Sequence, residues 1–298
     1  LPGPESFTPD GAFLMGPAPD VKGLFTLTGM NSSGIGQSGG AAKVLAEWID
    51  GGEPTIDITA FDMRRFPRVF GNTSWVAERA KELPSWVFDV NMPRREHKHA
   101  RNIRLSPFHT RFETKGARFG QAAGWERPNW FAPNSKDVGN PLTWKRPGWF
   151  DVVAEEHKAA RGNVALFERT PMAKIMVEGA DAEELLQTLC ANDIAGDNGR
   201  LIYTAMLNTK GGFESDLTVT RLAENRFLLI TGANEGVRDL DHVVRHAGER
   251  RVSITDVTGA YAGVALSGPS ARELLSRVTE NDLSNEAFPY LTTREIWI

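Results

Sequence analysis

The sequence has little cysteine, no long apolar run and no excess of basic charge. Its one cysteine, Cys190, excludes an intrachain disulfide framework and a cysteine-based zinc site. No apolar run approaches the roughly 20 residues that span a bilayer. The formal net charge of -4 argues against a nucleic-acid binder and a polybasic membrane anchor. With 41% hydrophobic and 24% charged residues, the composition is that of a globular protein, for which we predict a cytoplasmic location. The alternative is the mitochondrial matrix if the source is eukaryotic.

Both ends of the chain suggest a cut. The first residue is Leu1, and the opening LPGPESFTPDG has neither the basic start nor the apolar core of a signal peptide. The last residues, 294–298, read REIWI, an apolar alternation that predicts an unfinished strand. We therefore expect an internal piece of a longer chain. The alternative is a processed mature protein that ends on a strand.

The first 66 residues predict a strand, a glycine-rich turn and a helix. The apolar segment GLFTLT precedes the turn Gly29–Gly40, which reads GMNSSGIGQSGG. In the segment that follows, Val44, Leu45, Trp48 and Ile49 fall at helical spacing. The next two residues are glycines and supply a helix stop.

The rest of the chain divides at about residue 127. Residues 67–127 mix aromatics, prolines and basic residues without a long amphipathic period, which predicts a connecting domain with an irregular path. From residue 128, short strands and helices mix without strict βαβ order, which indicates the α+β class. Residues 180–193 form an amphipathic helix in this prediction, and a turn at Thr209–Gly212 joins two strands.

A glycine-rich turn before a helix is suited to an anion, because first-turn N–H groups and the helix dipole favour negative charge. The turn alone is also compatible with an ordinary structural turn. Residues 6–11, together with the segment from Gly29 to Phe66, closely resemble the C-terminal end of the FAD domain in dimethylglycine and sarcosine dehydrogenases. The resemblance implies bound FAD. It places these residues nearest the flavin: Thr8, Pro9, Asp10, Ser33, Gly34, Ile35 and Gly36.

An acidic residue, Asp216, follows the turn at Thr209–Gly212 directly, with Tyr203 and Asn208 on the preceding strand. An acid there can hydrogen-bond a pterin or steady a developing cation at an amine, and it is also compatible with a surface residue that ends a turn. The segments ALFERTPMAKIMVEG, YTAMLNTKGGFESDLTV and YAGVALSGPSARELL closely resemble the glycine-cleavage T-protein, an aminomethyltransferase domain. The resemblance makes Asp216 a catalytic acid. It implies these tetrahydrofolate contacts: Met172, Tyr203, Asn208 and Asp216.

Taken together, the resemblance covers nearly the whole chain and implies three parts. These are the end of an FAD-binding α/β domain (1–66), the connecting domain (67–127) and a truncated T-protein-like α+β domain (128–298). The implied activity is oxidative demethylation of a small N-methylated amino acid, with transfer of the one-carbon unit to tetrahydrofolate. The alternatives are a folate-dependent aminomethyltransferase or demethylase without flavin chemistry, and a non-catalytic homologue. The sequence leaves the oligomeric state undecided.

Three other features are given no catalytic or metal-binding role in this interpretation. His97 and His99 lie two residues apart, but no carboxylate or cysteine in a metal-ligand pattern stands beside them, so we predict no metal site. Ser33 and Ser38 lack the turn context of a serine hydrolase. Cys190 falls in an apolar helical run and is predicted to be an inert buried thiol.

We expect the 298-residue chain to purify colourless, because the N-terminal Rossmann fingerprint of the family that it resembles, a G-x-G-x-x-G after a first strand, is absent. Visible absorption spectroscopy of the purified chain checks this expectation. A stoichiometric yellow flavin spectrum would show that the chain holds FAD without the fingerprint.

Overall fold

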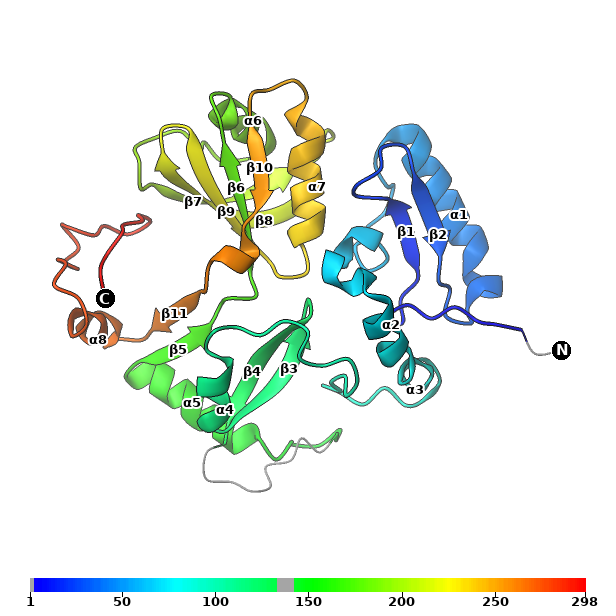
Figure 1. The fold of residues 1–298 in the computed structure, drawn as a ribbon, viewed down its shortest axis with the longest axis horizontal. Helices are drawn as coiled ribbons and strands as arrows, with labels where there is room; N and C mark the ends of the chain where they lie inside the picture. Colours follow the sequence, from blue (N-terminus) through cyan, green and yellow to red (C-terminus); the bar gives the residue numbers. More distant parts are fainter. Residues whose placement is uncertain (1–2, 133–141) are drawn as a thin grey trace. The chain divides into compact units, whose positions relative to one another are not determined.

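The structure is a computed structural model that describes residues 3–132 and 142–298 (Figure 1). It consists of two compact units. Unit 1 comprises the described parts of residues 1–105, 119–126 and 140–147. Unit 2 comprises the described parts of residues 106–118, 127–139 and 148–298.

Unit 1 begins with an antiparallel pair of strands packed against one long helix. Its elements are β1 (Leu14–Pro17), β2 (Phe25–Thr28), α1 (Gly34–Gly51), the 3-10 helices η1 (Met63–Arg65) and η2 (Arg68–Gly71), α2 (Thr73–Ala80) and α3 (Leu83–Phe88). A small apolar core holds the strand pair to α1: Phe13, Met15, Ala41, Trp48 and Ile58. The strand and the helix predicted from the sequence both form here.

Helix α1 begins earlier than the sequence predicts. The chain turns at Gly29, Asn31 and Ser32, all with positive φ, and is already helical at Gly34. The prediction that the turn extends to Gly40 is therefore wrong. Burial of Ala41 and Trp48 anchors the second half of α1, and the helix extends from there through glycines that disfavour it only mildly. The predicted stop is confirmed: α1 ends at Gly51, and Gly52 caps it with φ of 78°.

Residues 67–127 contain only short regular elements, none longer than eight residues. The helices α2 and α3 belong to unit 1, and α4 (His109–Thr114) belongs to unit 2. The strands β3 (Ala117–Ala122) and β4 (Trp125–Phe131) form a two-stranded sheet. The sequence predicted an irregular path for residues 67–127 because they lack a long amphipathic period. The structure has short helices and one hairpin in this region.

Unit 2 is built on a five-stranded antiparallel sheet in the order β10-β6-β9-β8-β7. Its strands are β6 (Ala173–Glu178), β7 (Leu201–Leu207), β8 (Phe213–Ala223), β9 (Arg226–Thr231) and β10 (Ser253–Asp256). The remaining elements are α5 (Phe150–Gly162), β5 (Ala165–Glu168), α6 (Ala182–Leu189), α7 (Gly236–Ala247), η3 (Thr258–Ala260), β11 (Val264–Ser267) and α8 (Ala271–Ser276). This mixture of strands and helices confirms the predicted α+β class.

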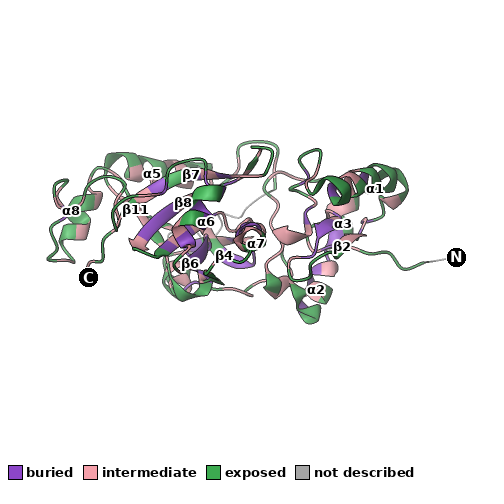
Figure 2. Ribbon diagram, turned by 90° about the horizontal axis from the view of Figure 1, so that it is seen from above, coloured by how far each residue is buried: buried purple, intermediate pink, exposed green. Residues whose placement is uncertain are grey.

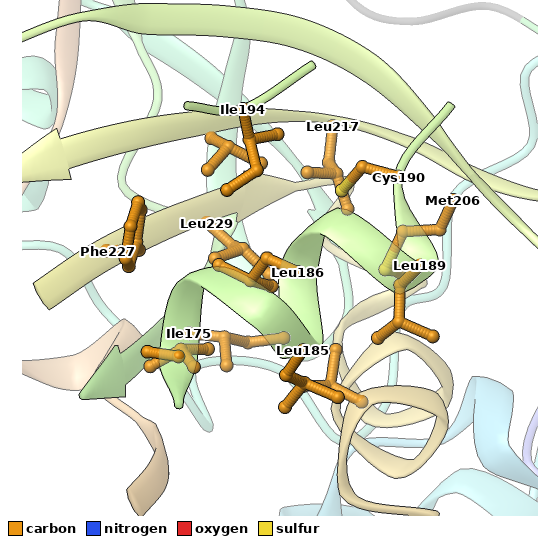
Figure 3. Close-up of a cluster of buried hydrophobic side chains, with 14 residues drawn as sticks. Ile175, Leu185, Leu186, Leu189, Cys190, Ile194, Met206, Leu217, Phe227 and Leu229 are labelled. Atoms are coloured by element: carbon orange, nitrogen blue, oxygen red, sulfur yellow. The ribbon is translucent and has the colours of Figure 1, made fainter. Parts of the chain in front are cut away.

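Helices α6 and α7 cover one face of this sheet. Leu185, Leu186 and Leu189 of α6 share one face of the helix, as predicted, and all three are buried against strand residues such as Leu217 and Leu229 (Figure 3). Figure 2 shows the contrast between the buried strands of unit 2 and the largely exposed α1. Cys190 lies in the same apolar cluster. The prediction of a buried thiol is confirmed, and burial raises its pKa to about 12, which disfavours the reactive thiolate.

The strand predicted for residues 294–298 does not form. These residues pair with no strand in the described parts of the chain. Trp297 and Ile298 are exposed, and the backbone N–H of Trp297 donates to Asn281 Oδ1 at 3.1 Å. Alternation of apolar residues does not make a strand without a neighbour to hydrogen-bond. Among the described residues, no helix has the length and apolar character that a bilayer crossing requires.

Leu186→Ala is expected to lower the free energy of unfolding of unit 2 by about 2–5 kcal/mol, because Leu186 is fully buried and the substitution leaves a cavity. Urea unfolding followed by circular dichroism measures the change. The matched control is Leu274→Ala on α8, where the side chain is exposed and a change within about 0.5 kcal/mol is expected. Equal losses in the two variants would contradict this assignment of the core.

Candidate functional site

The sheet of unit 2 has a second face, opposite α6 and α7, and this face carries the candidate site. Directly opposed residues share a face of a sheet, so the pairs Lys174↔Ile230, Ile230↔Thr218 and Thr218↔Tyr203 define a row across four strands. Asp216 stands two residues along β8 from Thr218 and therefore points to the same side. The pleat thus brings Tyr203 and Asp216 together.

Tyr203 and Asp216 form a hydrogen-bonded pair. The Tyr203 hydroxyl donates to Asp216 Oδ2 at 2.7 Å. This bond and the negative charge of Asp216 raise the pKa of the Tyr203 phenol above its ordinary value. Tyr203 is 59% exposed, so the pair is open to a ligand. Among the described residues, the structure shows no hydrogen bond to the other carboxylate oxygen, Oδ1, which is left available as an acceptor.

A cavity of about 380 Å³ opens at this pair. Met172, Tyr203 and Asp216 line it, so the structure brings together three of the four residues predicted to contact folate. Sequence reasoning missed the rest of the lining, which includes Thr231 at the end of β9, Gly232 and Glu235 between β9 and α7, and Arg238 on α7. Those residues follow a strand end and start a helix, and no spacing in the sequence connects them with Asp216.

The side chain of Asn208, the fourth of these residues, forms hydrogen bonds within the turn that follows β7. Its side-chain Oδ1 accepts hydrogen bonds from the backbone N–H groups of Gly212 at 2.7 Å and Lys210 at 3.1 Å. These bonds close the turn between β7 and β8, and Gly211 adopts φ of 74° within it. The turn predicted at Thr209–Gly212 is confirmed. Asn208 is not part of the cavity lining.

A buried acid, Asp239, lies behind the cavity on α7. Its Oδ2 accepts from the hydroxyl of Ser215 at 2.7 Å and from that of Thr231 at 2.5 Å. All three side chains are at most 2% exposed. Burial raises the pKa of Asp239 to about 6, while the two hydroxyl bonds and Arg238 oppose that rise. The charged groups that act on Asp239 are Arg238 and Glu235.

In unit 1, the structure joins the two segments predicted to contact flavin. The backbone N–H of Thr8 donates to Asn31 Oδ1 at 2.9 Å, which ties residues 8–12 to the turn before α1. Gly29 permits this approach, because a Cβ at its position would stand 2.5 Å from Thr8 Cγ2. Asn31 is buried with φ of 49°. The sequence did not single it out, although Asn tolerates the left-handed conformation better than most residues.

Around this turn, the predicted residues differ in what they contact. Asp10 accepts from the guanidinium of Arg65 at 2.6 and 2.9 Å. Ser33 caps α1 without a side-chain cap bond, and Ile35 is 105% exposed in the first turn. A Cβ at Gly36 would meet nothing within 4 Å. In the first turn of the 18-residue helix α1, the backbone N–H of Gly36 donates to the carbonyl of Ser33 at 3.2 Å, and Ser33 makes no side-chain cap bond. The positive end of the helix dipole at this turn is compatible with an anionic ring edge.

His97 and His99 do have a carboxylate neighbour, which corrects the sequence interpretation. Glu82, far along the chain from both, places Oε1 2.7 Å from His97 Nδ1 and Oε2 3.3 Å from His99 Nδ1. Burial lowers the pKa of His97, so the imidazole favours its neutral form. Within the described ranges, no group of three or more His, Cys, Asp or Glu residues is arranged to hold a metal ion.

Two family models match the chain. The model described as "GCVT N-terminal domain" matches residues 108–298, and the model described as "FAD dependent oxidoreductase central domain" matches residues 51–106. The boundaries drawn from the sequence at residues 66 and 127 stay predictions.

Curated relatives match along nearly the whole chain. The 4-methylaminobutanoate oxidase (formaldehyde-forming) of Paenarthrobacter nicotinovorans is 38% identical over 100% of this chain and 36% of its own length. The mitochondrial pyruvate dehydrogenase phosphatase regulatory subunit of Mus musculus is 33% identical over 98% of this chain and 34% of its own length. The mitochondrial sarcosine dehydrogenase of Mus musculus is 33% identical over 97% of this chain and 36% of its own length. The chain spans about a third of the length of these relatives.

A solved structure shares part of the fold of this chain. The crystal structure of glycine cleavage system aminomethyltransferase T from Bartonella henselae is 27% identical, with a TM-score of 0.52. The likeness covers 64% of this chain and 47% of that chain.

Asp239→Asn is expected to remove a pH-dependent loss of stability. With a folded pKa of about 6 and an unfolded value near 4, native Asp239 keeps its proton in the folded state where the unfolded chain releases it. The contribution of Asp239 to the free energy of unfolding therefore falls by up to about 3 kcal/mol as the pH rises from 4 to 6, and this contribution then stays constant.

The variant, which has no proton to lose at this position, should gain on the native chain over that interval. Urea unfolding at pH 4, 5, 6 and 7 measures the difference between the two proteins. Parallel pH profiles would show that Asp239 ionises in the folded state as it does in the unfolded chain.

Proposed function

This chain belongs to the GCVT N-terminal domain family, within the sarcosine and dimethylglycine dehydrogenase group, and from that premise we propose its function. We propose that it contributes to oxidative demethylation of a small N-methylated amino acid, with transfer of the one-carbon unit to tetrahydrofolate. The observation that carries the proposal is the exposed Tyr203–Asp216 pair at the mouth of the unit 2 cavity. Dimethylglycine and sarcosine are the substrates to test first.

The chemistry of the pair fits a reduced pterin. A pterin presents ring N–H and amino groups, and the cavity offers carboxylates on Asp216 and Glu235 as acceptors. Tyr203 holds one oxygen of Asp216, which leaves Oδ1 directed to a ligand. Met172 adds an apolar contact at the rim. Asp216 would orient the folate, and its charge would steady positive charge that develops at the reacting nitrogen.

In unit 1, the fit to flavin rests on backbone. The turn at residues 31–36 leads into the start of α1, where the helix dipole favours negative charge, and Gly36 leaves space for a flat ring. FAD, when bound, supplies the acceptor for the hydride that leaves the N-methyl group. Thr8 and Asn31 would hold this turn in place, while Asp10, in its ion pair with Arg65, would fix the neighbouring loop.

A folate enzyme without flavin chemistry is less well supported. The match to the FAD dependent oxidoreductase central domain covers residues 51–106, in a region that such an enzyme has no need of.

The second candidate is a non-catalytic regulatory protein. It is favoured by the 33% identity with a relative that is named a regulatory subunit. The two candidates differ at the cavity: a regulatory chain requires neither the Tyr203–Asp216 pair nor folate binding. Tetrahydrofolate titration of the full-length protein therefore separates them.

Asp216→Asn in the full-length protein is expected to lower one-carbon transfer to tetrahydrofolate by at least about tenfold, because the amide loses the charge and part of the acceptor capacity. Flavin reduction by sarcosine or dimethylglycine should persist. Stopped-flow flavin absorbance measures the first step, and formation of the folate product measures the second. The control, Glu224→Gln, changes an exposed acid at the other end of β8 and β9. Equal loss of both steps in Asp216→Asn would refute the division of roles.

A further inference from the structure

We propose that Arg238 and Asp239 of α7 are positioning residues that hold the start of β8 so that Asp216 points at Tyr203. The two α7 residues bind the two residues that precede Asp216 in the chain: Arg238 binds the carbonyl of Glu214, and Asp239 binds the hydroxyl of Ser215. The consequence for ligand affinity rests on the proposed folate function, whereas the geometry of the Tyr203–Asp216 pair does not.

Strand β8 is irregular just before Asp216. Ala205 pairs with Asp216 and Met206 pairs with Ser215, but Leu207 pairs with Phe213. Glu214 is therefore the extra residue of a β-bulge. A bulge bends its strand and changes the direction of the side chains that follow it, so the direction of Asp216 depends on how this bulge is held.

Arg238 holds the bulged residue itself. Its Nη2 donates to the backbone carbonyl of Glu214 at 2.6 Å, and the Arg238 side chain is mostly buried. A residue in a bulge lacks its ladder partner, so a carbonyl there needs another donor when it is shielded from water. The charged guanidinium gives a stronger bond than a neutral donor would.

Asp239 holds the next residue. Ser215 turns its side chain to the helix-covered face because Asp216 occupies the open face, and its hydroxyl donates to Asp239 Oδ2. The same oxygen accepts from Thr231 at the end of β9, so one carboxylate fixes the ends of two neighbouring strands. Arg238 Nε also lies 3.8 Å from Asp239 Oδ1, which links the two anchors to each other.

These contacts leave the start of β8 little freedom. Glu214 is held at its carbonyl and Ser215 at its hydroxyl, and both anchors come from consecutive residues of one helix. Release of either anchor allows the bulge to relax or shift, and the first side chain to move is Asp216. The hydrogen bond from Tyr203 then lengthens or breaks, although neither member of that pair has been changed.

The titration of Tyr203 reports this movement directly. The chain has three tyrosines, so NMR of the 298-residue chain labelled with carbon-13 at the tyrosine Cζ gives three signals, and Tyr203→Phe identifies the relevant one. In the native chain the bond to Asp216 raises the pKa of the Tyr203 phenol. In Arg238→Met and in Asp239→Leu, we expect that pKa to fall toward the value found in Asp216→Asn.

The control is Asp241→Asn on the same helix. Asp241 is also buried, but its carboxylate pairs with Arg245 at 2.6 Å on α7, so the substitution should leave the Tyr203 titration unchanged. Ser215→Ala, a smaller change that removes the anchor from the strand side, replaces Asp239→Leu if that variant does not fold. An unshifted Tyr203 titration in folded Arg238→Met and Ser215→Ala chains would overturn the proposal.

Tetrahydrofolate affinity of the full-length protein provides the second measurement. Asp239→Leu should weaken binding about tenfold when Asp216 is present and by less than about twofold in an Asp216→Asn background, because the effect passes through Asp216. Equal weakening in both backgrounds would overturn the positioning role. If the native protein binds no tetrahydrofolate, the proposed function fails, and the Tyr203 titration still decides whether Arg238 and Asp239 position Asp216.

Discussion

In the five-stranded sheet of unit 2, successive side chains of a strand turn to opposite faces, and burial of one face under α6 and α7 decides what the other can do. Leu217 of β8 and Leu229 of β9 pack in the core under the helices. Their neighbours in the chain, Asp216 and Ile230, must therefore lie on the open face. A shift of one residue in register would expose the leucines and bury the acid. The position of the candidate site is therefore set by the packing of the core.

Much of this arrangement can be predicted from the sequence because it depends on local patterns. The leucine spacing of α6 and the glycine turn after β7 act within a few residues, and both form as expected. The early start of α1 cannot be predicted from local patterns. Its glycines favour a turn, whereas the burial of Trp48, which depends on the fold, stabilises the helix. The cluster around Asp239 is equally hidden, since Ser215 lies 24 residues away and only the fold makes them neighbours.

The two candidate sites use different physical means. In unit 1 the turn before α1 presents backbone, and the buried side chains of Thr8 and Asn31 support the loop. In unit 2 the polar side chains of Tyr203 and Asp216 themselves form the exposed surface. Many substitutions in the first site act through backbone conformation, as at Gly29, whereas substitutions in the second remove a chemical group directly.

The contrast between the buried and exposed polar groups of unit 2 has a consequence for divergence. Ser215, Thr231 and Asp239 satisfy one another away from water, so loss of any one removes buried hydrogen bonds and weakens the fold. Tyr203 and Asp216 face solvent, where replacement costs the fold little. A lineage that abandoned this cavity would therefore keep the trio and lose the pair. In a related chain, the surface pair records whether the cavity is still in use, while the buried trio records only that the domain still folds.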